Sequence, residues 1–526
     1  MMNNNMNNIE KIPQEKFEFV QLDARLHDKK LDTKARSYFA DAMLRFSKNK
    51  SSVIAAWILL FLLIFSILSP IISPYDVKTD KDNIYVSSPS YVEWIADMGL
   101  GFMDGARKQP TQNDLAMTKW YAIEEELSRG HEDYTGKVVI NVLETEAYTT
   151  KIRGREVTLY NRTIETNFYR DKGIVYRNMQ PDEYKALQDW QNETGIQVIY
   201  PAVDPENLKN ISTQSEMPNV WYQVNAKGEP VQDKDGNLTP AYCTDISKMG
   251  EGGEYYSMRV EGDDGSYIYA LAKSGSLQVR VSYYHYYIYK NGHAPMYLFG
   301  TTNLGQDLFC AIGVGARFSL IFAVCVSVIN MFLGAVYGAI QGYYGGWVDM
   351  LLDRIVDILS GVPFVVVTTL FQLHLASKVG VLPSFLFAFV LTGWIGMAAL
   401  VRKQFYRFKS LEFVMAARTL GAGDFRLMFK HIFPNALGTI VTSCALVIPS
   451  AISSETSMTY LGIVDLNTYA GSTIGTLLSN GRSAMMTSPS AMLWPSLFFA
   501  LLMISFNLFG NGLRDAFNPS TRGADD

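Results

Sequence analysis

The segment Leu411–Asn435, LEFVMAARTLGAGDFRLMFKHIFPN, decides the fold, because it is polar and basic and lies between two apolar runs of membrane-spanning length. Residues 411–420 are compatible with a helix, and the glycines of 421–423 permit a sharp turn that most residues resist. Asp424 can cap a second short helix, which Pro434 is expected to stop or redirect. The pattern predicts a short helical hairpin, with an ordinary amphipathic loop helix as the alternative.

The hydrophobic residues on either side of this segment are clustered into long runs. Ser51–Ile72 carries no charge and is long enough for the roughly 20 residues that a bilayer-spanning helix needs. With it, the further runs predict six spans, at about 319–341, 355–376, 382–401, 436–452 and 491–509. The region of about 76–295 has no such run and is rich in Tyr, Asp, Lys, Asn and Gly. We therefore predict an α-helical polytopic membrane protein with a large water-soluble insertion between spans 1 and 2.

Basic residues beside the spans predict their orientation, since positive charge marks the cytoplasmic side. They include Lys48, Lys50, Arg402, Lys403, Arg407, Lys409, Arg514 and Arg522. Both termini and the hairpin are thus expected inside, and the first run is expected to be a retained signal anchor, because about fifty polar residues precede it. The expected organisation is a cytoplasmic segment 1–50, a first span 51–74, an extracytoplasmic insertion 75–298, a five-span domain 299–519 and a cytoplasmic tail 520–526.

The insertion has the pattern of an α+β domain. Its elements are predicted as a helix at 114–129, strands at 137–143, 156–160, 197–200 and 276–282, and hairpin turns at 225–228 and 233–237. A Tyr-rich strand is expected between His285 and His293, with aromatic rings that pack the domain rather than bind a ligand. The 233–237 turn resembles the start of a calcium loop, but the bidentate Glu expected further on is missing.

Composition and motifs exclude several chemistries. Only Cys243 of the four cysteines lies well inside the insertion, so no disulfide is expected within it; the others are Cys310, Cys325 and Cys444. The absence of a CxxC pair or Cys/His cluster predicts no metal site. The mild net charge of −5 argues against nucleic acid as a partner. Because the chain lacks a GxxxxGK[ST] phosphate loop, it cannot hydrolyse ATP by that route, and we identify no catalytic residue.

Charged residues near the span ends predict contacts within the membrane. Arg317 and Glu455 both fall near the outer boundary, and we expect them to pair and brace an outer gate, with interfacial solvation as the alternative. Acidic and basic residues also cluster at the inner end of the third span: Asp349, Asp353, Arg354 and Asp357. Gly334 and Gly338, four residues apart, predict a tightly packed face on the second span.

Several motifs in order resemble one family. They are GTTNLGQD (300–307), GARFSL (315–320), GYYGGWVDMLLDRIVDIL (342–359), the 411–435 hairpin, ETSMTYLGI (455–463) and FNLFGNGLRDAFNP (506–519). Residues 36–76 and 299–519 resemble the C-type permease subunit of oligopeptide and dipeptide ABC importers, and the hairpin resembles their EAA loop. The sequence departs from the family pattern at three places. Met415 occupies the position of the Glu that gives the EAA loop its name, and Gln306 replaces the Arg of an LGRD motif. The insertion replaces a short loop.

The resemblance implies a transport subunit of a bacterial cell membrane rather than an enzyme. Ala416, Ala417 and Gly421 would allow close contact between the hairpin and an ATPase, and Phe433 and Pro434 would fix its exit. The implied partners are a B-type permease, two ATPase subunits that bind ATP and Mg²⁺, and a lipid-anchored extracytoplasmic peptide-binding protein. This chain would bind no cofactor directly and would line the pathway within the lipid bilayer.

Other functions differ from this one in testable ways. Related permeases also carry nickel, glycopeptides or similar solutes, and no side-chain set separates these cargoes. A receptor or sensor would need a cytoplasmic signalling domain, whereas the cytoplasmic parts here are short. A secondary transporter would show inverted repeats and interrupted spans, and neither is visible. The insertion is expected to contact the binding protein or form an entrance vestibule, with a structural role as the alternative.

Overall fold

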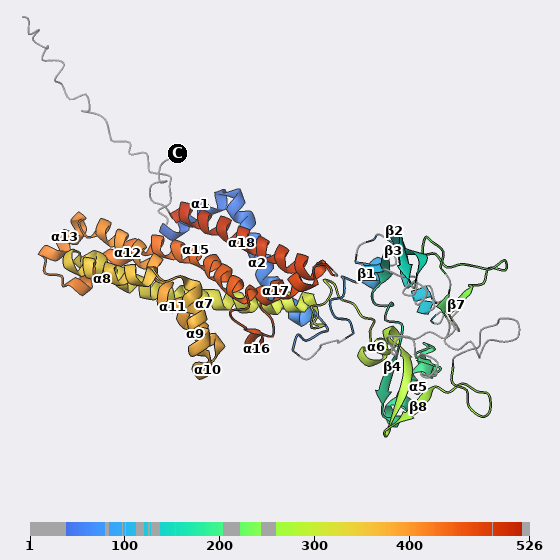
Figure 1. Cartoon of the computed structure of the whole chain (residues 1–526). Helices are drawn as coiled ribbons and strands as arrows, with labels where there is room; N and C mark the ends of the chain where they lie inside the picture. Colours follow the sequence, from blue (N-terminus) through green and yellow to red (C-terminus); the bar gives the residue numbers. More distant parts are fainter. Residues whose placement is uncertain are drawn as a thin grey trace, which may run out of the picture.

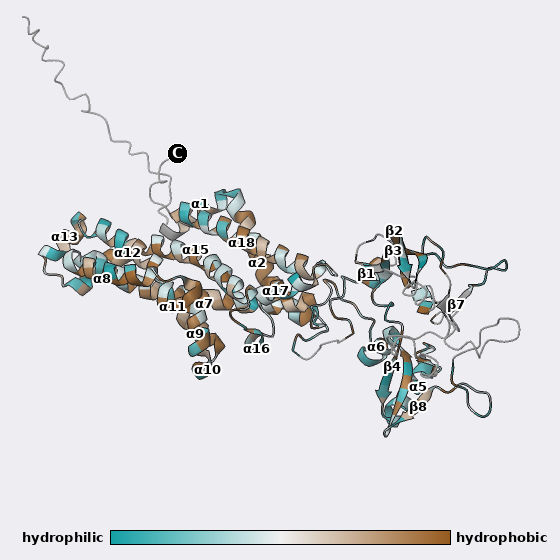
Figure 2. Ribbon diagram, in the orientation of Figure 1, coloured by the Kyte–Doolittle hydropathy of each residue, from teal (hydrophilic) through white to brown (hydrophobic). Residues whose placement is uncertain are grey.

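A helical bundle and a smaller α+β domain occupy opposite ends of the molecule (Figure 1). The computed structural model describes residues 38–78, 84–96, 98–99, 101, 103–111, 120–121, 123–124, 127, 137–152, 154–203, 221–222, 224–242, 259–486 and 488–517. Hydrophobic residues dominate the bundle and hydrophilic residues the domain (Figure 2). We call the two ends of the bundle the domain end and the hairpin end, after the α+β domain and the 411–435 segment.

The long helices of the bundle match the predicted spans. Among the described residues, five stretches are long and apolar enough to cross a membrane: α2 (Lys50–Ile72), α7 (Leu308–Tyr344), α11 with α12 (Val381–Phe408), Asp424–Tyr460 and α18 (Ser490–Phe517). Shorter helices of the bundle are α1 (Tyr38–Lys48), α10 (Ala376–Val379), α16 (Asn467–Ala470) and α17 (Ile474–Ala484). The prediction of a helical polytopic membrane protein is confirmed.

The third predicted span is broken, which corrects the expectation of uninterrupted spans. Helices α8 (Gly346–Ser360) and α9 (Phe364–His374) meet at an angle of 73° and together make up a sixth candidate span. Pro363 is the residue before α9 and has a non-helical ψ of 134°. A proline disfavours helical geometry at the residue before it and lacks an amide donor, so the helix ends ahead of Pro363 and restarts in a new direction.

Helix α7 is at the centre of the bundle and packs against α2, α12 and α15 (Phe433–Tyr460). Its glycines allow the close approach to α12. A Cβ added to Gly334 would lie 2.7 Å from Met397 Cβ, and one added to Gly338 would lie 2.3 Å from the carbonyl oxygen of Ala398. These distances leave no room for a side chain, so the predicted tightly packed glycine face is confirmed.

The α+β domain contains two main antiparallel sheets. One has the order β1-β3-β2, and the other has the order β4-β9-β5 with β8 paired to β9; β6 and β7 form a small separate pair. The strands are β1 (Ala106–Thr111), β2 (Val139–Ile152), β3 (Arg155–Asn167), β4 (Ile174–Met179), β5 (Ile199–Tyr200), β6 (Trp221–Tyr222), β7 (Pro240–Tyr242), β8 (Ala270–Lys273) and β9 (Ser276–Ser282). Its helices are α3 (Glu93–Ala96), α5 (Pro181–Thr194) and α6 (Tyr283–Asn291). The four predicted strands correspond to β2, β3, β5 and β9.

Local predictions in the domain had mixed outcomes. Both hairpin turns are present: Gly228 N–H donates to the Asn225 carbonyl, and Gly236 N–H donates to that of Asp233. The predicted Tyr-rich strand is wrong, because 283–291 is helix α6, which buries Tyr283, Tyr284 and Tyr287 at helical spacing. Most of the helix predicted at 114–129 and all of the N-terminal leader up to residue 37 lie outside the described residues, as does Cys243.

A cluster of buried tyrosines joins the domain to the bundle. Tyr75 follows α2 and Tyr297 precedes α7, and their rings stack with centroids 4.7 Å apart. The hydroxyl of Tyr287 lies 3.2 Å from that of Tyr75 and 3.1 Å from that of Tyr297. We call these three residues the tyrosine joint. The tyrosine joint connects α6 of the domain to the segment that follows α2 and to the segment that precedes α7. Trp494 of α18 also stacks on Phe299, two residues after Tyr297.

Candidate functional site: the hairpin and its mount

The predicted hairpin lies at the end of the bundle farthest from the α+β domain (Figure 1). Helix α13 (Glu412–Thr419) leads into Gly421, whose φ of +85° is in the region that favours glycine. The chain then turns into α14 (Asp424–Arg426) and the π-helix η4 (Leu427–Ile432), which leads directly into α15. The helix-turn-helix geometry expected from the sequence is therefore present.

Pro434 does not stop or redirect the second helix, contrary to the expectation. It is at the start of α15, and the chain from Asp424 to Tyr460 is a single span-length stretch. The physical reason is the π-helix before it, in which Phe433 N–H donates to the Met428 carbonyl five residues back. Single π-turns are rare and occur mostly inside α-helices at functional sites. Here the widened turn precedes the proline, whose missing amide costs little at the first turn of α15.

The predicted contact residues lie on or beside the exposed tip. Ala416 and Gly421 are exposed, Ala417 is half-buried, and a Cβ added to Gly421 would meet no atom within 4 Å. Phe433 and Pro434 lie at the base of the hairpin, where Phe433 packs against the buried cluster described next and Pro434 is exposed. The structure thus places the small residues where a partner could reach their backbone, and it places Phe433 and Pro434 away from them.

The hairpin is held firmly by buried side chains. Val414 of α13 packs with Leu427 and Ile432 of η4 against Val401 and Phe405 of α12. All five side chains are fully buried. Burial of a large aliphatic or aromatic side chain contributes about 1.5–3 kcal/mol, so this cluster fixes the hairpin to the bundle.

Hydrogen bonds also hold the hairpin to the bundle. Tyr343, near the end of α7, donates its hydroxyl proton to Asp424 Oδ1 at 2.6 Å. Arg418 of α13 donates to the same Tyr343 oxygen at 3.3 Å. Lys409 Nζ donates to the carbonyl of Gly342 at 2.9 Å, which joins the end of α12 to the end of α7. These contacts tie the hairpin to the ends of α7 and α12.

The outer surface of the hairpin carries large apolar side chains among its exposed charged residues. Leu411, at the start of the hairpin, is exposed, and so are four further large hydrophobic side chains that we call the tip cluster: Phe413, Met415, Leu420 and Phe425. Leu420 has 89% of its surface exposed and lies beside the turn at Gly421. A group of exposed apolar side chains on a rigid element is typical of a protein contact surface. The small residues that indicate a close contact in the sequence do not predict this cluster.

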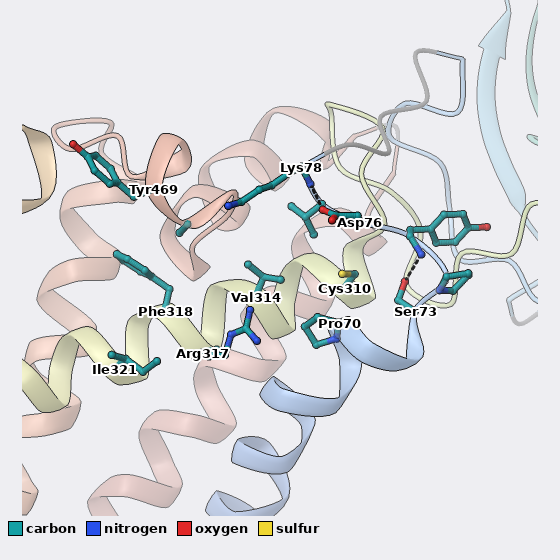
Figure 3. Close-up of a pocket in the computed structure, with 14 residues that line it drawn as sticks. Pro70, Ser73, Asp76, Lys78, Cys310, Val314, Arg317, Phe318, Ile321 and Tyr469 are labelled. Atoms are coloured by element: carbon teal, nitrogen blue, oxygen red, sulfur yellow. Dashed lines mark hydrogen bonds between the residues drawn. The ribbon is translucent and has the colours of Figure 1, made fainter. Parts of the chain in front are cut away.

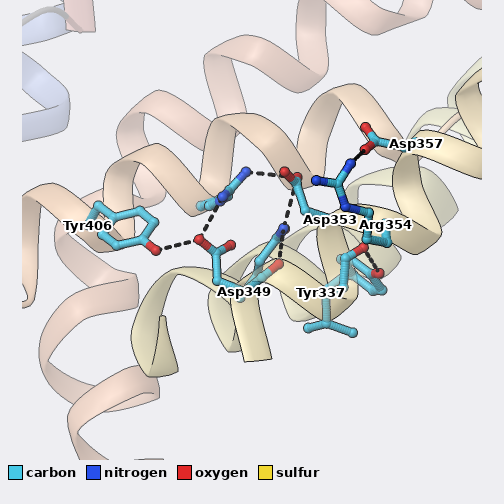
Figure 4. A network of polar contacts seen from close by, with 9 residues as sticks. Tyr337, Asp349, Asp353, Arg354, Asp357 and Tyr406 are labelled. Carbon is cyan, nitrogen blue, oxygen red and sulfur yellow. Dashed lines mark hydrogen bonds and ion pairs between the residues drawn. The ribbon is translucent and has the colours of Figure 1, made fainter. Parts of the chain in front are cut away.

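A network of charged residues braces the same end of the bundle (Figure 4). Arg402 of α12 donates to Asp349 at 2.6 Å and to Asp353 at 2.9 Å, both on α8. The hydroxyl of Tyr406 donates to Asp349 at 2.6 Å, and Gln341 donates to Asp353 at 3.2 Å. Asp349 and Asp353 are thus paired across two helices, whereas Asp357 pairs with Arg354 within α8. In the sequence, Arg402 indicates only the orientation of the span, so its pairing with Asp349 and Asp353 is not predicted.

The predicted pair of Arg317 and Glu455 is not formed in this structure. Glu455 is fully buried and accepts a hydrogen bond from Ser319 Oγ at 2.8 Å. Arg317 is exposed and lines a separate cavity of about 560 Å³ near Lys78 and Tyr469 (Figure 3). The reason is helical spacing: two residues turn an α-helix by roughly 200°, so Arg317 points away from the side on which Ser319 meets Glu455.

Comparison with known proteins identifies the family. Residues 330–523 match the family described as binding-protein-dependent transport system inner membrane component, and residues 37–89 match the N-terminal TM domain of oligopeptide transport permease C. Much of the α+β domain falls between the two matched regions.

Individual relatives agree with these matches. The chain is 40% identical over 228 residues to the oligopeptide transport system permease protein OppC of Bacillus subtilis (strain 168), which covers 43% of this chain and 72% of that protein. It is 34% identical over 225 residues to the dipeptide transport system permease protein DppC of the same organism, covering 43% and 69%. A solved structure of the MetNI methionine ABC transporter in an inward-facing conformation aligns over 40% of this chain and 96% of that chain, with 13% identity and a TM-score of 0.32. The chain belongs to the binding-protein-dependent inner-membrane transport family and is a permease component of an ABC importer.

Proposed function

We propose that this chain forms part of the transmembrane path of an ATP-driven peptide importer and that its hairpin receives the force from an ATPase subunit. The peptide cargo is supported by the relatives, whose names describe oligopeptide and dipeptide permeases. The hairpin end would face the cytoplasm, in accordance with the basic residues Arg402, Lys403, Arg407 and Lys409 beside it. The α+β domain would then lie outside the cell.

The tip cluster carries this proposal. It is mounted by the buried Val414 and by the Tyr343–Asp424 hydrogen bond, so a force on the tip is passed to α7 and α12. Two ATPase subunits that bind ATP and Mg²⁺ would close on each other and displace the hairpin, and a second, B-type permease would complete the path. The bundle would switch between two arrangements whose populations depend on the nucleotide.

A substitution at the tip tests this proposal. Leu420→Glu places a charge on a side chain that contacts little in this chain, so the fold should tolerate it. Burial of that charge in an ATPase cleft is unfavourable, so we expect the ATPase subunits to be lost on co-purification from mild detergent and ATP-dependent peptide uptake to fall more than tenfold. Met486→Glu is the matched control, because Met486 is also 89% exposed but lies at the domain end. Full ATPase retention and uptake with Leu420→Glu would contradict the proposal.

The α+β domain is proposed to receive a lipid-anchored, peptide-binding protein or to shape the entrance of the path. Its attachment at the tyrosine joint, directly beside the starts of α7 and α18, supports this role. Replacing the domain with a short linker between residues 76 and 297 should leave the ATPase subunits bound and reduce uptake. Uptake of a series of peptides of different length, measured in cells with and without this chain, would define the cargo. If no peptide is taken up, the proposal of a peptide cargo is refuted.

A further inference from the structure

A small cavity with a mainly apolar wall and four polar side chains lies beside the bend of the broken span. It has a volume of about 210 Å³ and is lined by residues of α7, α9, α11 and α15. Phe364, one of its lining residues, is the first residue of α9, immediately after the 73° bend. The polar side chains in its wall are Asn330, Thr392, Ser450 and Ser454. Polar groups at this depth in a membrane protein are costly and mark a path or a binding site.

Asn330 has a buried side-chain oxygen without a hydrogen-bond donor in the described part of the chain. It is 98% buried, and among the described residues no donor is placed to hydrogen-bond its Oδ1 atom. A Cβ added to Gly393 would lie 2.3 Å from Asn330 Nδ2, so the absence of a side chain at 393 makes the room in which the amide sits. A buried carbonyl without a donor costs about 1–3 kcal/mol, and such a group in a native protein needs an explanation.

The chemistry of the wall limits the ligand. Among the described residues that line the cavity, none carries a charge, so a carboxylate, an ammonium group or a metal ion would be poorly accommodated. The amide and hydroxyl groups instead fit a neutral group that both donates and accepts hydrogen bonds. The volume is below the roughly 300–1,000 Å³ of a pocket for a whole small molecule, so the cavity holds one segment of a longer ligand.

The cavity is also open on one side. Ser450 is exposed in the single chain and Ser454 is half-buried, although both lie within a helix of a membrane span. Hydroxyl groups at this depth are more favourably covered by protein or water than by lipid tails. The open side of the cavity thus lies at the surface of this chain, where a second subunit could cover it.

We propose that this cavity is a subsite of the transport path that binds one neutral peptide unit of the cargo, with Asn330 Oδ1 accepting a backbone N–H. This inference rests on the proposed function as a peptide importer. Because the contact is with the peptide backbone and not with a side chain, the subsite accepts peptides of different sequence. The cavity lies against α9, so a change in the bend between α8 and α9 would alter the shape of the cavity. Binding and release of the peptide unit would therefore follow the conformational cycle of the importer.

The test uses the complete importer, with both permeases, the ATPase subunits and the peptide-binding protein, in proteoliposomes. Uptake of trialanine is compared with uptake of trialanine whose internal peptide nitrogens are methylated and cannot donate. Asn330→Leu removes the acceptor. A second variant, Ser450→Ala with Ser454→Ala, removes two hydroxyls at an exposed and a half-buried position, so the fold should tolerate it. We expect each variant to raise the KM for trialanine about five- to tenfold, which corresponds to one lost hydrogen bond. The preference of Asn330→Leu for trialanine over the methylated peptide should fall by a similar factor.

Ser327→Ala is the matched control. Ser327 is buried on the same helix, one turn from Asn330, and does not line the cavity, so its loss should leave KM and the preference unchanged. A wild-type KM and an unchanged preference in both cavity variants would overturn the subsite while leaving the importer function intact. If the wild-type importer carries no alanine peptide of two to six residues, the peptide function itself fails and the assigned ligand fails with it.

Discussion

Arg402 holds the hairpin end of the bundle together, and its removal gives a quantitative test. In Arg402→Met the side chain keeps much of its apolar length but loses both ion pairs with α8. The side chain of Asp349 has only 12% of its surface exposed, and that of Arg402 28%. Breaking a fully buried pair costs about 3–5 kcal/mol, whereas an exposed pair contributes about 0–1 kcal/mol. The intermediate burial here predicts a loss of about 2–3 kcal/mol in the free energy of unfolding.

Helix α8, which carries Asp349 and Asp353, also supplies the control for this experiment. Arg354 pairs with Asp357 at 3.0 Å, but these two side chains are 74% and 57% exposed. Arg354→Met should therefore cost less than about 1 kcal/mol. Both variants can be unfolded with sodium dodecyl sulfate in mixed micelles and followed by circular dichroism. Asp349→Asn, alone and combined with Arg402→Met, completes a double-mutant cycle in which the coupling energy should be about 1–2 kcal/mol. Equal losses for the two arginine variants, or a coupling energy near zero, would refute the reasoning.

Three further variants probe other contacts. Gly338→Ala should destabilise the bundle by at least about 1–3 kcal/mol in the same unfolding assay because the new Cβ meets the backbone of α12, whereas Gly396→Ala, where a Cβ meets no atom, should not be destabilising. Tyr287→Phe removes both hydroxyl contacts of the tyrosine joint and should accelerate hydrogen–deuterium exchange at residues 293–298; wild-type exchange would contradict that role. Gly421→Val should abolish ATPase association in co-purification while Gly421→Asn retains it, since Asn tolerates a positive φ and Val does not; equal binding by both would count against a backbone effect at the turn.

The spans could be predicted from the sequence because hydrophobicity over about 20 residues is a signal that packing does not alter. The run predicted at 51–72 is α2, and the glycine spacing of 334 and 338 correctly indicated a close helix contact. The hairpin followed from its glycines, because Gly421 has the positive φ that such a turn needs. In each case a local property of the residues determines the outcome.

The failures share a different cause: they depend on partners distant in the sequence or on competing local signals. The bend was signalled by Pro363, but continuous hydrophobicity on both sides concealed it. The aromatic residues of 283–291 favour strands by intrinsic propensity, and burial of one helical face against the domain core overrode that preference. Arg317 and Glu455 were paired by depth alone, although side-chain direction around α7 separates them.

The stacking of Tyr75 on Tyr297 has a consequence for how the α+β domain is joined to the bundle. The chain leaves the bundle after α2 and comes back before α7 at almost the same point, since the two rings lie 4.7 Å apart. A domain whose termini are neighbours can be added to a loop without forcing apart the helices on either side. More than two hundred residues, 76–296, thus lie between two neighbouring points of the chain, so the domain does not require α2 and α7 to separate.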